Sequence, residues 1–254
     1  MAAPTVQAHD IIATVSGATN ITFTWTNGDG ARRAVFVALH DGTGSPVAPA
    51  NGTQYSGDAA FMAGTRVGST PYYCVYDGTG TTVPVTNLSP GVQYLIQICE
   101  YNGTGGTTEY LTIAAVLNPL EPWTVTAAPY LYDPTSITDH SFVLNWFRTL
   151  GATGYRLDVS SNAIFTALLI DNGDVLNVVT FLADTLTPQA VLWSRIRAYN
   201  TAGTSSNSNV VVCQIKHILP TRPHISRPSG SRPRSNYTGV GILASSIYED
   251  VWEA

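Results

Sequence analysis

The chain has 254 residues, of which 44% are apolar and only 11% are charged, with 22 Gly, 15 Pro and 13 Tyr. This length suits two domains of ordinary size, each able to bury its own core. The formal net charge of −5 argues against nonspecific nucleic-acid binding, because that binding needs a basic face.

Runs of β-branched and aromatic residues, separated by Gly, Asn, Asp and Pro, predict a succession of short strands. In the first half we expect strands at 20–26, 32–39, 71–76, 82–86, 92–101 and 107–113. The segments 27–30 and 77–80 contain Asn-Gly or Asp-Gly pairs, which tolerate the positive φ of tight hairpins. We therefore expect hairpin turns at both places.

The second half repeats this plan, with strands expected at 141–146, 154–160, 168–171, 177–182, 192–199 and 210–215. Prolines at 119, 122 and 129 bracket the junction between the halves, so we expect a short stiff linker there. The predicted organisation is therefore a first domain over 1–118, a linker over 119–123, a second domain over 124–216 and an arm over 217–254.

Two Trp-to-Asn frames show that the halves are copies of one module. Trp25 and Trp146 lie in corresponding early strands, and Asn102 and Asn200 end corresponding late strands. Each copy also has a Leu-Ser/Thr-Pro step before the late strand, at Leu88 and at Leu186 in the two copies. Internal repetition of this kind fixes the architecture before any single motif is considered.

As a set, these residues resemble tandem fibronectin type III modules over about 4–215, similar to those of Bacteroidetes proteins and of tailed-phage virion proteins. The resemblance implies an all-β fold of two immunoglobulin-like β-sandwiches. It also implies structural roles for Trp25, Trp146 and Tyr94, whose hydroxyl would form the tyrosine corner. Counting back from Asn200 places Leu192 at the corner of the second copy, with the neighbouring Trp193 facing the other way.

The copies differ in length. Trp25 and Asn102 lie 77 positions apart, whereas Trp146 and Asn200 lie 54 positions apart, so the first copy carries an insertion, which we place at about 41–70. Long loops of this kind are functional or are packed by their own side chains. Because the insertion contains Tyr55, Phe61 and Met62, we expect a packed flap that covers a sheet edge. A loop that contacts a ligand or partner through these three residues is the alternative.

No pattern for catalysis, metal binding or cofactor binding stands out. The three cysteines, Cys74, Cys99 and Cys213, are odd in number and lie in apolar strands, which favours buried free thiols. We expect His40 and His140, each beside an Asp, to face solvent, and the Asp-Asn-Gly-Asp run at 171–174 to be a hairpin turn rather than a calcium site. We therefore expect no enzyme, no metal and no cofactor.

The tail is the most functional-looking segment. The body up to residue 215 carries seven Arg against fourteen Asp and Glu, whereas residues 216–234 carry five basic residues and no acidic one. The stretch 220–235 is rich in Pro and Arg and is expected to be extended. The basic residues that we expect to contact a partner are Arg222, Arg227, Arg232 and Arg234.

Apolar residues return at the very end of the chain. Leu243, Ile247 and Val251 recur at steps of four, with Tyr248 and Trp252 adjacent, which is the spacing of an amphipathic helix. So short a helix is marginal alone and needs a surface. We expect these residues to dock into another subunit, by groove binding or strand addition. Folding back on the chain's own sandwich is the alternative.

Together these features favour a non-enzymatic structural protein of a virion, namely a bacteriophage capsid decoration, collar, tail or fibre component. Its partners would be other virion proteins and copies of itself in a symmetric assembly, with no nucleic acid and no membrane. The first residues lack a signal-peptide pattern, so we expect synthesis in the host cytoplasm. The alternative is an extracellular, secreted bacterial adhesion or carbohydrate-binding accessory module.

Overall fold

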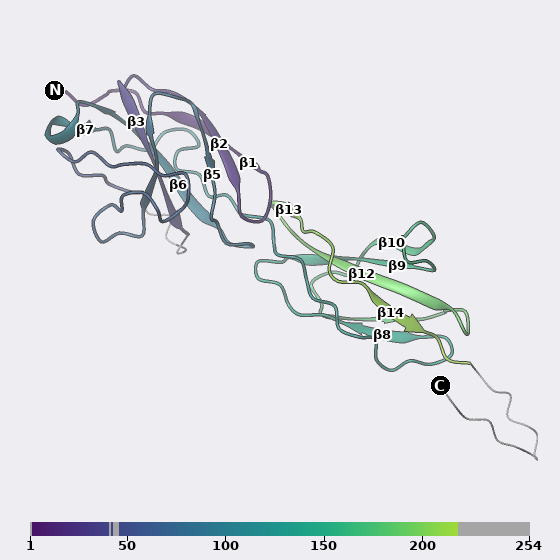
Figure 1. Ribbon diagram of the computed structural model, residues 1–254. Helices are drawn as coiled ribbons and strands as arrows, with labels where there is room; N and C mark the ends of the chain where they lie inside the picture. Colours follow the sequence, from purple (N-terminus) through teal and green to yellow (C-terminus); the bar gives the residue numbers. More distant parts are fainter. Residues whose placement is uncertain (1, 41, 43–45, 218–254) are drawn as a thin grey trace, which may run out of the picture. The chain divides into compact units, whose positions relative to one another are not determined.

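The computed structural model describes residues 2–40, 42 and 46–217, and it contains two β-sandwiches in succession (Figure 1). The expected arm residues at 218–254 lie outside the described part of the chain. The strands confirm the tandem fibronectin type III-like architecture that the repeat predicts.

The first sandwich packs a three-stranded sheet against a four-stranded sheet, and all their strand pairs are antiparallel. The smaller sheet has the order β1-β2-β5, with β1 (His9–Val15), β2 (Ile21–Thr26) and β5 (Thr82–Val85). The larger sheet has the order β4-β3-β6-β7, with β3 (Arg32–Leu39), β4 (Tyr73–Gly78), β6 (Tyr94–Asn102) and β7 (Glu109–Tyr110). A short 3-10 helix, η1 (Gly105–Thr107), precedes β7.

The second sandwich repeats this topology. Its smaller sheet pairs β8 (Phe142–Asn145) with β11 (Thr180–Ala183), and single bridges at Leu131 and Thr135 add the preceding segment to the edge of β8. Its larger sheet has the order β10-β9-β12-β13, with β14 also paired to β12. These strands are β9 (Gly154–Ser160), β10 (Leu168–Asp174), β12 (Val191–Asn200), β13 (Gly203–Thr204) and β14 (Val211–Gln214).

Each sandwich has its own apolar core between its two sheets. Trp25 packs in the first core with Phe23 and Ile98, and Trp146 packs in the second with Leu144 and Leu192. This burial follows from the alternation of inward and outward side chains along each strand. The structural roles expected of Trp25 and Trp146 therefore match their positions.

The larger sheet of the first sandwich is buried on both faces. Every residue of β6 except Asn102 is buried, whereas β12 alternates between buried and half-buried residues. The reason is the insertion, because Val47, Tyr55 and Val67 pack on the outer face of this sheet and form a second core there. Tyr55 meets Phe36 edge to face, with ring centroids 5.4 Å apart.

The insertion is thus a packed flap, as expected, but it covers more than the expected edge. It spreads over the outer face of the larger sheet through Tyr55 and also pairs with the edge strand β4 through the bridge between Arg66 and Tyr73. The sequence of β6 does not alternate between apolar and polar residues, which is typical of a strand that is covered on both sides.

The hairpins predicted at 27–30 and 77–80 are wrong. Residues 27–30 connect β2 to β3, and residues 77–80 lead from β4 to β5; each connection passes between two different sheets. Gly28 is required there for close approach, since a Cβ at this position would lie 2.0 Å from the Val6 carbonyl oxygen. Small turn residues here serve a crossing between sheets rather than a tight turn within one sheet.

The hairpin predicted at 171–174 is also wrong. These residues belong to β10, whose register with β9 shifts between Ile170 and Gly173. Asn172 adopts a left-handed φ of 51°, which Asn tolerates better than most residues. The run is therefore a bulge in an edge strand, a feature that bends the strand locally.

The segment 119–123, predicted as a linker, pairs with β6 instead. The amide of Tyr94 donates to the Pro122 carbonyl oxygen at 2.9 Å, and Ile96 and Leu120 exchange backbone hydrogen bonds at 2.9 and 3.0 Å. The buried side chain of Asn118 bonds both the amide and the carbonyl of Ile98, at 3.1 and 2.8 Å. Together with β7 this segment completes the edge of the sheet, so the first sandwich extends beyond residue 118.

The tyrosine corner is present in the first copy only. The Tyr94 hydroxyl accepts a hydrogen bond of 2.7 Å from the Ser89 amide. Leu192 occupies the corresponding place in the second copy and is buried, while Trp193 is half-buried on the other face of β12. Both positions are as the sequence predicted.

We predict that Tyr94→Phe lowers the free energy of unfolding of the first sandwich by about 1–2 kcal/mol, because the half-buried Ser89 amide loses its acceptor. Chemical denaturation of the full chain measures this change. Tyr130→Phe is the control, since Tyr130 is 59% exposed and should change stability by less than about 0.5 kcal/mol. Equal effects of the two changes would contradict the role of the corner.

Candidate functional site

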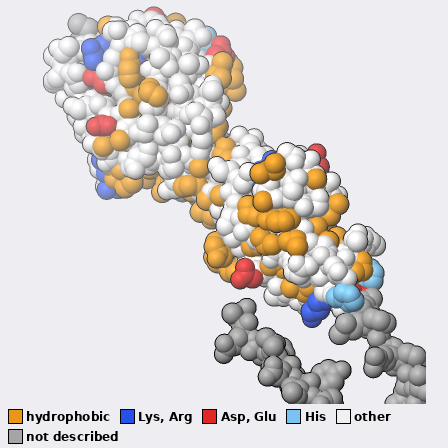
Figure 2. Space-filling model, turned by 45° about the vertical axis from the view of Figure 1, so that its right-hand side comes forward, with side chains coloured by type: hydrophobic (Ala, Val, Ile, Leu, Met, Phe, Trp, Pro, Cys, Tyr) orange, Lys and Arg blue, Asp and Glu red, His pale blue; other side chains and the backbone are white. Residues whose placement is uncertain are grey.

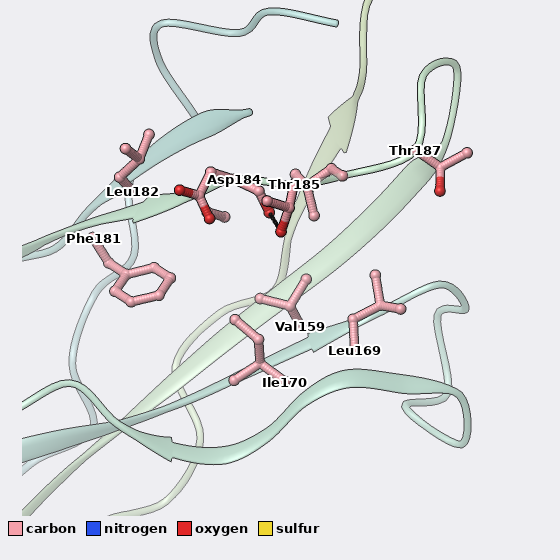
Figure 3. A pocket seen from close by; sticks show the side chains of 10 residues that line it. Val159, Leu169, Ile170, Phe181, Leu182, Asp184, Thr185 and Thr187 are labelled. Carbon is pink, nitrogen blue, oxygen red and sulfur yellow. Dashed lines mark hydrogen bonds between the residues drawn. The ribbon is translucent and has the colours of Figure 1, made fainter. Parts of the chain in front are cut away.

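The second sandwich has an open pocket of about 370 Å³ between its two edge strands. Ile170 of β10 and Val159 of β9 form one wall, Phe181 of β11 faces them, and these side chains point into the space between the strands (Figure 3). The full lining is Val159, Leu169, Ile170, Phe181, Leu182, Ala183, Asp184, Thr185, Leu186 and Thr187. An apolar concave site with a few polar groups at its rim is the usual form of a binding site.

The rim of this pocket contains strained backbone. Thr185 has a left-handed φ of 58°, which is a true outlier for a β-branched residue. Its hydroxyl donates to the Asp184 carbonyl oxygen at 2.7 Å. Backbone strain of this kind concentrates at functional positions. The strained rim and the apolar wall therefore both indicate that this pocket is a functional site.

No local sequence pattern predicts these pocket residues, because they come from two different sheets. The one signal was the shorter distance between Trp146 and Asn200 than between Trp25 and Asn102. That difference implies that the second copy lacks the covering segment of the first.

A second exposed feature is the outer face of the smaller sheet of the second sandwich. Phe147 is 64% exposed and lies in line with Tyr130, to whose carbonyl its amide donates at 2.9 Å. Tyr130 and Tyr132 meet edge to face, with centroids 5.4 Å apart. Hydrophobic side chains gather over this sandwich (Figure 2). Contiguous apolar patches of this kind mark interaction surfaces.

The charged groups of the second sandwich are unequally paired. The buried Asp158 carboxylate binds Arg195 at 2.8 Å and Arg197 at 3.0 Å, so these groups neutralise one another. Asp171 and Asp184 are exposed and form no ion pair with any described residue. They leave negative charge beside the pocket, available to a basic partner.

Of the insertion residues proposed as a contact, two are inaccessible to a partner in this conformation. Tyr55 and Phe61 are 4% and 5% exposed, in the outer and inner cores of the first sandwich respectively. Met62 is 58% exposed and alone presents its side chain to solvent. The arm residues from Arg222 to Trp252 lie outside the described residues.

The predicted free thiols are confirmed, since Cys74, Cys99 and Cys213 are all buried and unpaired. Burial raises the pKa of Cys74 to about 12 and also raises the pKa values of Cys99 and Cys213. Neutral thiols of this kind are poor nucleophiles, so these cysteines act as core residues.

His40 and His140 differ in their exposure to solvent. His140 is exposed and lies 2.9 Å from Asp139, as expected. His40 is not solvent-facing, because its side chain is only 14% exposed and its Nε2 lies 3.3 Å from the Glu121 carboxylate. Within residues 2–40, 42 and 46–217, no three His, Cys, Asp or Glu side chains gather as a metal site would require. The same residues include no helix long and apolar enough to span a membrane.

No protein-family model and no curated protein matches the chain. Among solved structures, a two-domain fibronectin type III segment from chicken tenascin is 12% identical, with a TM-score of 0.40, over 84% of this chain and 99% of that chain. The FN1-FN3 domains of chicken CNTN1 are 14% identical, with a TM-score of 0.35, over 85% of this chain and 69% of that chain. The fold assignment therefore rests on the strand topology, and these similarities add nothing about function.

Proposed function

We propose that this chain is a non-enzymatic structural protein of a virion, a capsid decoration, collar, tail or fibre component of a bacteriophage. Its two sandwiches would act as spacers or decorations, and the arm over 217–254 would anchor the subunit to its neighbours. The observation that carries the proposal is the combination of a basic, Pro-rich arm with an apolar end and a second sandwich that exposes an apolar pocket and sheet face.

Charge supports an arm that contacts other copies. Residues up to 215 are acidic overall, whereas residues 216–234 carry only basic charges. Asp171 and Asp184 remain unneutralised on the described surface of the second sandwich. Opposite potentials on arm and body favour encounter between subunits.

The cysteines support folding in a reducing compartment. Three buried free thiols fit a protein made in the cytoplasm, where thiols remain reduced, better than one matured in an oxidising space. A virion protein is assembled in such a compartment.

We predict that removing residues 217–254 leaves both sandwiches folded and abolishes incorporation into particles. Among the residues that the structure describes, the last buried one, Ile215, precedes the cut, so circular dichroism should show an unchanged β spectrum. Mass spectrometry of particles purified from cells that supply either chain measures incorporation. The unchanged full-length chain, supplied in the same way, serves as the control. Equal incorporation of the shortened chain would refute the anchoring role.

A secreted carbohydrate-binding or adhesion module is the second candidate, and the exposed rings of Tyr130 and Tyr132 favour it. Exposed aromatic faces can stack on sugar rings, as they stack on other planar or apolar groups.

For this candidate we predict binding to a glycan array that Tyr130→Ala and Tyr132→Ala each weaken at least about tenfold, the factor of a lost stacking contact. Ile164→Ala, at a residue 77% exposed, is the matched control. If no glycan binds, or if the control weakens binding equally, this candidate fails.

A further inference from the structure

Each sandwich has a gap between the free sides of its two edge strands. In the first sandwich, β4 pairs with β3 and β5 pairs with β2, so the gap lies between β4 and β5. In the second sandwich, β10 pairs with β9 and β11 pairs with β8, so the corresponding gap lies between β10 and β11. Unpaired edges and an open core are hazards that natural sandwiches cover.

In the first sandwich the insertion closes this gap with its backbone. The Cys74 amide of β4 donates to the Thr65 carbonyl at 2.9 Å, and the amide of Asp58 donates to the Cys74 carbonyl at 3.2 Å. On the other side, Thr86, directly after β5, exchanges hydrogen bonds with Ala59 and Phe61 at 2.8 and 3.0 Å. One chain segment, 58–67, thus bonds to both edges.

A single aromatic side chain fills the gap itself. Phe61 enters the inner core and meets Tyr94 edge to face at 5.3 Å and Tyr73 at 5.8 Å. Asn87 holds the segment in place, because its side-chain amide donates a hydrogen bond to the Phe61 carbonyl oxygen at 3.1 Å. Asn87 has a left-handed φ of 60°.

In the second sandwich the corresponding place is the open pocket. Thr185 is the counterpart of Asn87, since each directly precedes the Leu of the Leu-Ser/Thr-Pro step and each has a left-handed φ, of 58° and 60°. Leu192 replaces the Tyr94 ring against which Phe61 packs, and a volume of about 370 Å³ lies between the edge strands. The two edge strands and the left-handed residue that receive the segment 58–67 are therefore repeated, whereas the Tyr94 ring and the segment itself are not.

We propose that this pocket is the receptor for the C-terminal segment 241–254, which would close the second sandwich as 58–67 closes the first. This inference rests on the proposed anchoring function and names the surface that the anchor contacts. The segment offers the same chemistry as the insertion, since it carries Tyr248 and Trp252 among the aliphatic residues Leu243, Ile247 and Val251.

Charge and reach agree with this assignment. Four arginines, from Arg222 to Arg234, precede the segment, and the exposed carboxylates of Asp171 and Asp184 lie in the strand and loop that border the pocket. The stretch 218–240 could span up to about 75 Å when extended, which is ample for a pocket on a neighbouring copy.

Photo-crosslinking in the full-length chain tests the proposal. A photoreactive phenylalanine analogue replaces Trp252, and the crosslinked residues are identified by mass spectrometry. We expect crosslinks to 168–171 and 181–187. Leu169→Asp, at a pocket residue 57% exposed, should reduce their yield about tenfold or more, because it places a charge against an apolar ligand. Leu176→Asp, at a residue 67% exposed outside the lining, should leave the yield unchanged.

Crosslinks to other residues, or a yield that Leu169→Asp leaves unchanged, would overturn the assignment. Two further measurements separate this result from the anchoring function. Sedimentation of the same variants without the photoreactive residue measures whether the chains associate. Crosslinking in a mixture of isotopically light and heavy chains shows whether a crosslink joins two copies or lies within one. If the chain is monomeric and its pocket crosslinks lie within single copies, the pocket receives the segment but the segment does not anchor one subunit to another. If the chains associate only when the arm is present but give no pocket crosslinks, the arm anchors subunits and the pocket is not its receptor.

Discussion

Closure of the gap between the two sheets is the constraint on which the structure depends. A sandwich buries its core between two faces, but its edge strands leave backbone groups and core side chains open at the sides. The first copy meets this constraint within its own sequence, through hydrogen bonds from residues 58–67 to both edges and through the ring of Phe61. The second copy has the corresponding edge strands, β10 and β11, without the closing segment, so its core remains accessible through the pocket lined by Ile170 and Phe181.

The difference between the copies also explains their surfaces. Because the insertion covers the outer face of the first larger sheet, β6 is buried on both sides and carries mostly apolar residues on both faces. Its buried Glu100 is tolerated because the carboxylate lies 3.2 Å from Arg33 and accepts a 2.8 Å hydrogen bond from the Gly28 amide. In the second copy β12 alternates, and its outward arginines, Arg195 and Arg197, share the Asp158 carboxylate.

Features set by local patterns could be predicted from the sequence, and features set by contacts between sheets could not. Most strands follow from periodicity and the buried thiols from composition, whereas β1 (His9–Val15) is not among the predicted strands. The Tyr94 corner follows from the resemblance to fibronectin type III modules. The segment 27–30 has the residues of a hairpin, but Gly28 is there because the chain passes close to Val6. The prolines of 119–123 suggest a linker, yet that segment lies on a sheet edge and still accepts hydrogen bonds there. The pocket has no motif at all, since it arises from a segment that one copy has and the other lacks.

Closure of the second sandwich by the C-terminal segment can be measured by amide hydrogen exchange, in the full-length chain and in a chain that ends at residue 217. If the C-terminal segment closes the second sandwich, amides of 168–174 and 180–187 should exchange at least about tenfold more slowly in the full-length chain, because docking protects edge strands from local opening. Amides of β4 and β5, whose gap is already closed, should exchange equally in both chains. Equal exchange at 168–174 and 180–187 in the two chains, at concentrations where the full-length chain associates, would contradict the account.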